Sequence, residues 1–259
     1  AMMTADNDAK LAAGTVDMKD KAKIKAGSDA TIVATTSLDM IDDSKIKADA
    51  KVDIDAGDMT MKDDSRVDAG TDAFVDVTGL LEMKNKSEIA AGSNAKVTGA
   101  NVLMNNNSRL TGANNATVDL TGDMTMNNNA KVDATNLADV SVDGTLTMND
   151  SSAIDPVNVN LALGLLEMND SSSITASNNI TGSVTSDAAM NDDALISAGN
   201  DVNITGVGGQ MTMTGRSIIE AGRDAKVTAD ALTMNNRSKI RAARNAIVNI
   251  VNALLMNNN

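Results

Sequence analysis

The sequence predicts an all-β protein built as a right-handed, three-sided parallel β-helix, a β-solenoid of about 12 rungs with 21–22 residues each. Three observations predict this fold. Methionine recurs at intervals of 20 to 23 residues, a branched apolar residue follows each recurrence by six residues, and apolar residues come in pairs spaced by two. A fixed period of this length is typical of stacked repeats, and a spacing of two is typical of strands with one buried face. Right-handed winding is expected because parallel crossovers almost always have that hand.

Twelve key methionines define the repeat frame. They are Met18, Met40, Met61, Met83, Met104, Met126, Met148, Met168, Met190, Met213, Met234 and Met256. Six residues after each of the first eleven stand Ile24, Ile46, Val67, Ile89, Leu110, Val132, Ile154, Ile174, Ile196, Ile219 and Ile240. We therefore expect residues 1–259 to form one solenoid unit, a section of a longer repeat array, with Met3 in the branched-residue position of a partial first rung.

One complete rung is contained in residues 232–250. Its inward-facing pairs are expected to be Leu232 with Met234, Ile240 with Ala242, and Ala246 with Val248. Short polar stretches separate the pairs and predict the corners. Twelve rungs at the strand spacing of about 4.8 Å give a rod roughly 58 Å long.

The corners have a residue chemistry of their own. Four residues after each of the first eleven key methionines stands only Ser or Ala, which predicts a tight corner. Glycine recurs nine residues after the key methionine, as at Gly70 and Gly92, and suggests a left-handed or strained backbone. The rung from Met148 to Met168 is the shortest and contains Pro156, which cannot donate to a β-ladder. We expect a local defect there and no domain boundary.

Composition excludes several classes of function. The chain has no Cys and no His, so disulfides, thiolate metal sites and nucleophile–His catalysis lose their usual residues. The formal net charge of −13 argues against general nucleic-acid binding. The sequence contains no apolar run of about 18 residues, the length that would suggest a membrane-spanning helix. The turns are too short to build a substrate pocket, so we expect no enzymatic activity.

Two segments resemble a known class of repeat. AGNDVNIT at 198–205 and AGRDAKVTA at 221–229 are similar to the repeats of filamentous-haemagglutinin-type exoproteins, as found in two-partner secretion and autotransporter adhesins. The resemblance implies a right-handed parallel β-helix, an extracellular or cell-surface location in bacteria, and an adhesive or scaffold role. It assigns no functional residue, because the matching positions are those that build the rungs.

Stacked aspartates form a candidate calcium site. Two residues after the key methionine, eleven of twelve rungs carry Asp or Asn, and Gly215 is the exception. Carboxylates in consecutive rungs repel one another, and Ca²⁺ would relieve that repulsion because it prefers oxygen ligands. Solvent screening and nearby lysines such as Lys19, Lys21 and Lys62 are the competing explanation. The candidate ligands are Asp20, Asp42, Asp63, Asp150, Asp170 and Asp192.

A row of basic residues forms a second candidate site. Five residues after the key methionine, outward-facing cations are expected to form a ridge that attracts an anionic glycan. The ridge consists of Lys23, Lys45, Arg66, Arg109 and Lys131, interrupted by Glu88. The competing interpretation is a solvated face whose charges pair between rungs, and the usual behaviour of surface charges favours it.

These observations predict a non-catalytic shaft or stalk of a large secreted adhesin or extracellular fibre. One alternative is a self-assembling filament subunit, similar to bactofilin-type cytoskeletal helices. Another is a fragment of a polysaccharide-active β-helix enzyme. The expected partners are further rungs of the same chain or end-to-end copies, with a cell-surface glycan as a further candidate, and no nucleic acid.

Overall fold

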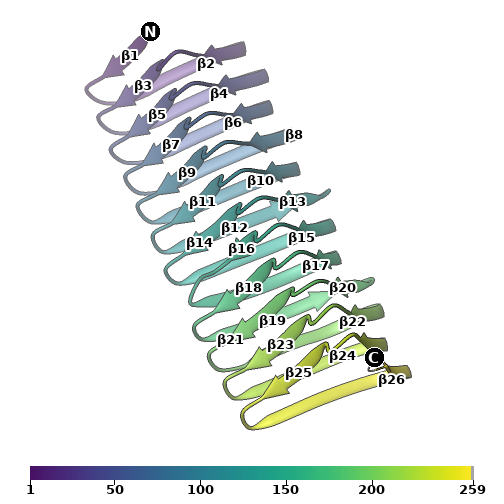
Figure 1. Cartoon of the computed structure of the whole chain (residues 1–259). Helices are drawn as coiled ribbons and strands as arrows, with labels where there is room; N and C mark the ends of the chain where they lie inside the picture. Colours follow the sequence, from purple (N-terminus) through teal and green to yellow (C-terminus); the bar gives the residue numbers. More distant parts are fainter. Residues whose placement is uncertain (258–259) are drawn as a thin grey trace.

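A computed structural model describes residues 1–257, and in that part of the chain every regular element is a β-strand. The strands lie in parallel and stack into an elongated β-solenoid, with the first rung at one end and the last at the other (Figure 1). Consecutive rungs pair through the whole stack, so the expected β-solenoid of about 12 rungs is confirmed.

One sheet contains twelve short strands, one for each rung. They are β1 Met2–Ala5, β3 Lys23–Ala26, β5 Lys45–Ala48, β7 Arg66–Ala69, β9 Glu88–Ala91, β11 Arg109–Gly112, β14 Lys131–Ala134, β16 Ala153–Ile154, β18 Ser173–Ala176, β21 Leu195–Ala198, β23 Ile218–Ala221 and β25 Lys239–Ala242. The branched residue of each rung faces inward here. Met3 pairs with Ile24, which confirms the partial first rung.

The second sheet contains the longer strands, which run up to the key methionines. They are β2 Ala9–Met18, β4 Ala30–Met40, β6 Val52–Met61, β8 Ala73–Met83, β10 Asn94–Met104, β12 Asn115–Leu120, β13 Met124–Met126, β15 Leu137–Met148, β17 Asn158–Met168, β19 Asn179–Val184, β20 Ala188–Met190, β22 Val202–Met213, β24 Asp224–Asn235 and β26 Asn245–Asn257. Every key methionine pairs with the next, from Met18 with Met40 to Met234 with Met256.

Most of the longer strands cover two of the three expected sides of a rung. In β4, Ala30, Ile32 and Ala34 are buried, the alternation then breaks at two exposed residues, and Leu38 and Met40 are buried again. The pairing of β4 with β6 shifts register at this point. In two rungs the break is complete and the strand divides, into β12 with β13 and β19 with β20. The third predicted corner is therefore a bend within one ladder in most rungs. The handedness stays a prediction.

The rung that contains Pro156 is locally irregular, as expected. Strand β16 has only two residues, and its ladder with β14 ends at Ile154, just before the proline. The corner is one residue shorter than in the other rungs, yet Val159 pairs with Ala138 in the common register. The defect is therefore absorbed within the corner, and the stack continues through it.

The core is one apolar column along the axis of the rod. Key methionines such as Met61 and branched residues such as Ile89 have no exposed surface in most rungs. Burial of one such side chain contributes about 1.5–3 kcal/mol, and each rung contributes several. Because each rung contacts mainly its neighbours, stability is a sum over rungs and their interfaces.

Candidate functional site

The predicted calcium ligands lie at a corner with an unusual backbone. In each of eleven rungs the second residue after the key methionine has a positive φ, between 47° and 59°. The next residue is also left-handed, for example Asp43 at 58° and Arg216 at 69°. Asp, Asn and Gly tolerate this conformation best among the amino acids. The column of Asp and Asn, with Gly215 as its exception, is thus explained by the backbone alone.

Two left-handed residues reverse the direction of the peptide hydrogen bonds at this corner. The Lys62 amide donates back to Met40 of the preceding rung at 2.9 Å, whereas the Asp43 amide donates forward to the Asp63 carbonyl at 2.8 Å. The same alternation recurs along the stack. The amides of the first and third corner residues therefore continue the β-ladder through the sharp turn.

The structure places the candidate carboxylates in two columns, one of Asp20, Asp42 and Asp63 and one of Asp150, Asp170 and Asp192. Five of the six residues are exposed, and the Asp63 carboxylate accepts a hydrogen bond from the side-chain amide of Asn85 at 2.7 Å. Within residues 1–257 no three Asp or Glu side chains meet in a group that could hold a metal ion. Calcium binding at these columns stays a prediction.

A chelator test addresses the calcium prediction. If the columns bind Ca²⁺, adding the chelator should lower the melting temperature, because binding to the folded state alone stabilises it. Asp42→Asn with Asp63→Asn should then remove the dependence, since Asn fits the left-handed backbone equally well. Equal melting curves with and without chelator would leave these residues as solvated corner positions.

A ladder of asparagines lies beside these columns and was not predicted from the sequence. Asn127, Asn149, Asn169 and Asn191 each donate a side-chain hydrogen bond to the asparagine of the preceding rung, at 2.7–2.9 Å, beginning at Asn105. Each amide accepts one bond and donates another, as in the asparagine ladders of stacked sheets. The sequence signal for this ladder is an asparagine directly after the key methionine in five successive rungs.

The serine column of the corner is buried, which confirms the tight corner. Seven serines, including Ser87 and Ser108, have no exposed surface, and their hydroxyl oxygens have no hydrogen-bond partner among the described residues. Ala22, Ala130 and Ala194 take the same position. An unpaired buried hydroxyl costs about 1–3 kcal/mol. The position therefore selects small volume, and the structure shows no role for the hydroxyl.

The recurrent glycines of the second corner have a different cause from the one predicted. Gly70 and Gly92 do not have a positive φ. A Cβ at Gly70 would lie 2.0 Å from the Asp49 carbonyl oxygen, and one at Gly92 would lie 2.1 Å from that of Gly70. The expectation of a left-handed backbone was wrong here. Glycine is needed because the carbonyl of the preceding rung approaches too closely for a side chain.

The basic ridge lies in register on the short-strand sheet, but much of it is neutralised. Lys45 contacts Asp68 at 2.8 Å, and Arg66 contacts Glu88 at 3.0 Å. Lys131 pairs with both Asp133 and Asp155, at 3.1 and 3.3 Å. The structure thus shows charge pairing between rungs at these members of the ridge. Recognition of an anionic glycan by the ridge stays a prediction.

Several carboxylates are held ionised by such pairs. Burial raises the pKa of Asp68, but the hydrogen bond from Lys45 and the charges of Arg66 and Lys47 lower it more, so that the net pKa lies below the ordinary value. Burial also raises the pKa of Glu82, but hydrogen bonds from Lys84 and Lys62 and the charges of these lysines lower it more, so that its net pKa is below the ordinary value.

Near the end of the chain, the hydrogen bond from Arg244 lowers the pKa of Asp224 to about 2, and Asn245 donates to the same carboxylate.

These lowered pKa values predict acid sensitivity. A carboxyl group whose pKa is depressed by folding stabilises the protein above its unfolded pKa of about 4, and that stability is lost as pH falls through the folded pKa. We expect the melting temperature to fall between about pH 4 and pH 2. Asp224→Asn should remove part of this dependence. A melting temperature that is constant over this range would show that the pairs contribute nothing.

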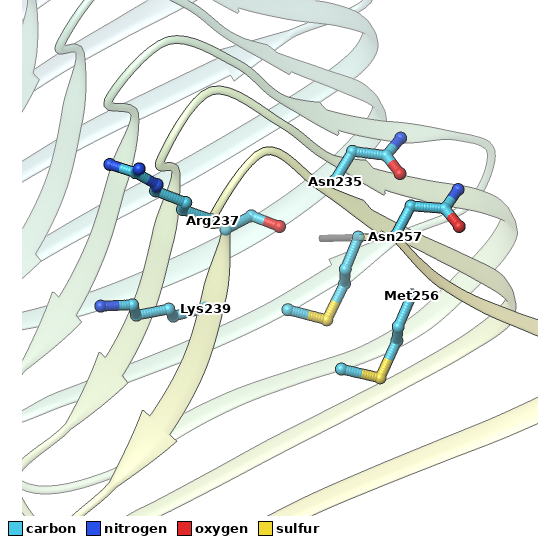
Figure 2. A pocket seen from close by; sticks show the side chains of 7 residues that line it. Asn235, Arg237, Lys239, Met256 and Asn257 are labelled. Atoms are coloured by element: carbon cyan, nitrogen blue, oxygen red, sulfur yellow. The ribbon is translucent and has the colours of Figure 1, made fainter. Parts of the chain in front are cut away.

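The surface has several hollows that are open to solvent. One hollow lies at the end of the stack, lined by Met234, Asn235, Arg237, Ser238, Lys239, Met256 and Asn257. Figure 2 shows Met256 directed into the space below the last corner, while Arg237 and Lys239 extend away from it. No acid and base converge there. The arrangement is the open cross-section of the core.

Comparison with protein-family models, with curated proteins and with solved structures finds no match for this chain. No helix in residues 1–257 has the length and apolar character to cross a membrane. The β-solenoid architecture is thus shown by the structure itself, and the haemagglutinin-type resemblance stays a hypothesis.

Proposed function

We propose that the chain is a non-catalytic shaft segment of a bacterial extracellular or cell-surface fibre or adhesin. The observation that carries the proposal is the unbroken pairing of the key methionines from Met18 to Met256. Such a column makes an elongated rod whose length is set by the number of rungs. The corners are short and closed by ladder bonds. Most residues therefore extend the rod, and few are left to form the long loops of a binding cleft.

The length of the rod in solution tests the shaft role. The chain has no cysteine, so Lys25→Cys and Ser197→Cys would be the only thiols available for spin labels. Eight rung intervals separate these positions in one column, which corresponds to about 38 Å. A narrow distance distribution near this value, retained at high ionic strength, supports a rigid spacer. A broad distribution would contradict it.

The enzymatic alternative is tested with polysaccharide substrates. We expect the chain to release no reducing ends from a panel of acidic and neutral polysaccharides. If the chain does release reducing ends, and replacing a surface carboxylate abolishes that release, the shaft proposal is wrong and the chain is a polysaccharide-active enzyme.

The filament alternative rests on the last strand of this chain. Apolar side chains of β26 are exposed, among them Val251 at 74% and Met256 at 66%. Such a face can be covered by further rungs or by another copy, since open strand edges template pairing. Electron microscopy of the 259-residue chain separates these cases: filaments support the subunit alternative, and single short rods support a segment of one longer shaft.

A further inference from the structure

The charges of this rod are distributed unequally around its cross-section. We define the short-strand face as the outward residues of the short strands together with Asp155, which follows β16. It carries nine cations and five anions, a net charge of +4. The cations are Lys23, Lys25, Lys45, Lys47, Arg66, Arg109, Lys131, Lys239 and Arg241, and the anions are Asp68, Glu88, Asp133, Asp155 and Glu220. This face is positive although the chain has a net charge of −13.

A second face has the opposite character. We define the distal face as the residues one and three positions before each key methionine, at the ends of the long strands. Within the described residues it carries no Lys or Arg and seven carboxylates, a net charge of −7. They are Asp17, Asp39, Asp58, Glu82, Asp123, Glu167 and Asp187. Asp17 pairs with Lys19, and Glu82 pairs with Lys62 and Lys84 of the adjoining corner. The other five form no salt bridge with the described residues.

The positive face contains a group of four lysines that is only partly neutralised, the lysine quartet of Lys23, Lys25, Lys45 and Lys47. Lys23 lies directly across the ladder from Lys45, and Lys25 across from Lys47. Like charges in directly opposite positions destabilise a sheet. Lys23, Lys25 and Lys47 form no salt bridge with any carboxylate of residues 1–257. Other cations of the same face each form at least one, and these are Lys45, Arg66, Lys131 and Arg241. Three of the four lysines in the quartet therefore present charge that the rod itself does not neutralise, and the fourth, Lys45, is paired with Asp68.

We propose that a second copy of this chain covers the lysine quartet, with the short-strand face of one rod against the distal face of the next. Each rod carries both halves of the contact. The contact is therefore heterologous and continues beyond a dimer into lateral bundles of rods. An acidic polymer would neutralise the lysines too, but it would leave the distal face uncovered.

Ionic strength gives this contact a recognisable signature. The Debye length is about 30 Å at 0.01 M, about 8 Å at 0.15 M and about 3 Å at 1 M. At the lowest ionic strength the net charges of whole rods repel one another. Near 0.15 M only the apposed faces interact, and at 1 M their attraction is screened too. Lateral association should therefore be strongest at intermediate ionic strength.

The test compares two charge-reversed variants of the 259-residue chain by sedimentation and light scattering. Lys23→Glu with Lys25→Glu reverses part of the quartet and creates opposite charges across the ladder from Lys45 and Lys47, so the fold should be retained. Lys10→Glu with Lys96→Glu is the matched control, because it makes the same change in net charge on the first part of the long strands. We expect the first variant to lose lateral association and the control to keep it.

Cross-linking locates the contact. A carbodiimide joins lysine amines to carboxylates in direct contact, and mixed isotope labelling identifies links between molecules. We expect links from the lysine quartet to Asp39, Asp123 or Glu167 of another copy. A chain that stays monomeric at every ionic strength, equal association of both variants, or links confined to the rod ends would overturn the proposal. A monomeric rod that binds to heparin, and loses that binding with Lys23→Glu and Lys25→Glu, would show that the quartet binds a polyanion and not a second copy.

Discussion

Ile219→Asp should abolish the folded state of the rungs around β23. Ile219 has no exposed surface, and its neighbours in the column, Ile196 and Ile240, are apolar. The substitution removes about 1.5–3 kcal/mol of apolar burial and places a carboxylate where no cation can reach it, which costs several kcal/mol more. We expect a large fall in the melting temperature, or loss of soluble protein. Ile89→Asp should behave in the same way.

The neighbouring residue provides the control. Ile218 lies one position earlier on the same strand, faces outward, and pairs across the ladder with Leu195 and Lys239. Ile218→Asp is the same chemical change with the side chain on the opposite face, so it should leave the melting temperature nearly unchanged. Comparable destabilisation by Ile218→Asp and Ile219→Asp in circular dichroism melts would show that the inward column is wrongly assigned.

Deletion of one whole rung should be tolerated, whereas deletion of half a rung should not. Removing residues 105–126 joins Met104 to Asn127, so that β14 pairs with β9 and β15 with β10 in the original register. The rod should shorten by about 4.8 Å and keep a cooperative melt. Removing only residues 105–115 leaves a half-rung that cannot reach its neighbours, and every ladder bond at that level is lost.

Small-angle scattering and thermal melts distinguish these outcomes. The whole-rung deletion should give a folded rod with a slightly smaller maximum dimension, and the half-rung deletion should give an expanded or aggregated species. Equal stability of the two deletions would contradict the rung as the unit of the fold. If one rung can be lost without unfolding, length is an adjustable property of this chain, as the shaft proposal requires.

Much of the fold could be predicted from the sequence because stacking imposes strict periodicity on the inward positions. Each rung stacks its methionine and its branched residue on the equivalent residues of the next rung. The apolar pattern of one rung is weak evidence for a strand, but its repetition in twelve rungs is strong evidence for a solenoid. Met3 could be placed for this reason, although its rung is incomplete. The bend within the long strands was less clear, because an interrupted alternation is equally typical of a corner between separate strands.

The candidate site was harder to interpret because one residue type serves several purposes. Aspartate suits both a calcium ligand and a left-handed backbone, and only the φ angles of Asp42 and Asp63 identify the backbone requirement. The recurrent glycines are ambiguous for a similar reason, since the sequence does not reveal how close the carbonyl of Asp49 lies to Gly70. Charge pairing was more accessible: Glu88 follows Arg66 by one repeat and therefore lies beside it.

Oxidation of the methionines in the native chain tests the solenoid most directly. Of the 17 methionines, only Met2, Met3 and Met256 have substantial exposed surface, at 73%, 36% and 66%, and the others are buried. With mild peroxide followed by peptide mass spectrometry, we expect these three to be oxidised in dispersed rods, or protected if rods stack end to end. The other 14 should resist, and all 17 should react in guanidinium. Rapid oxidation of Met83, Met126 and Met168 in the native chain would contradict the buried methionine column and the stacked rungs built on it.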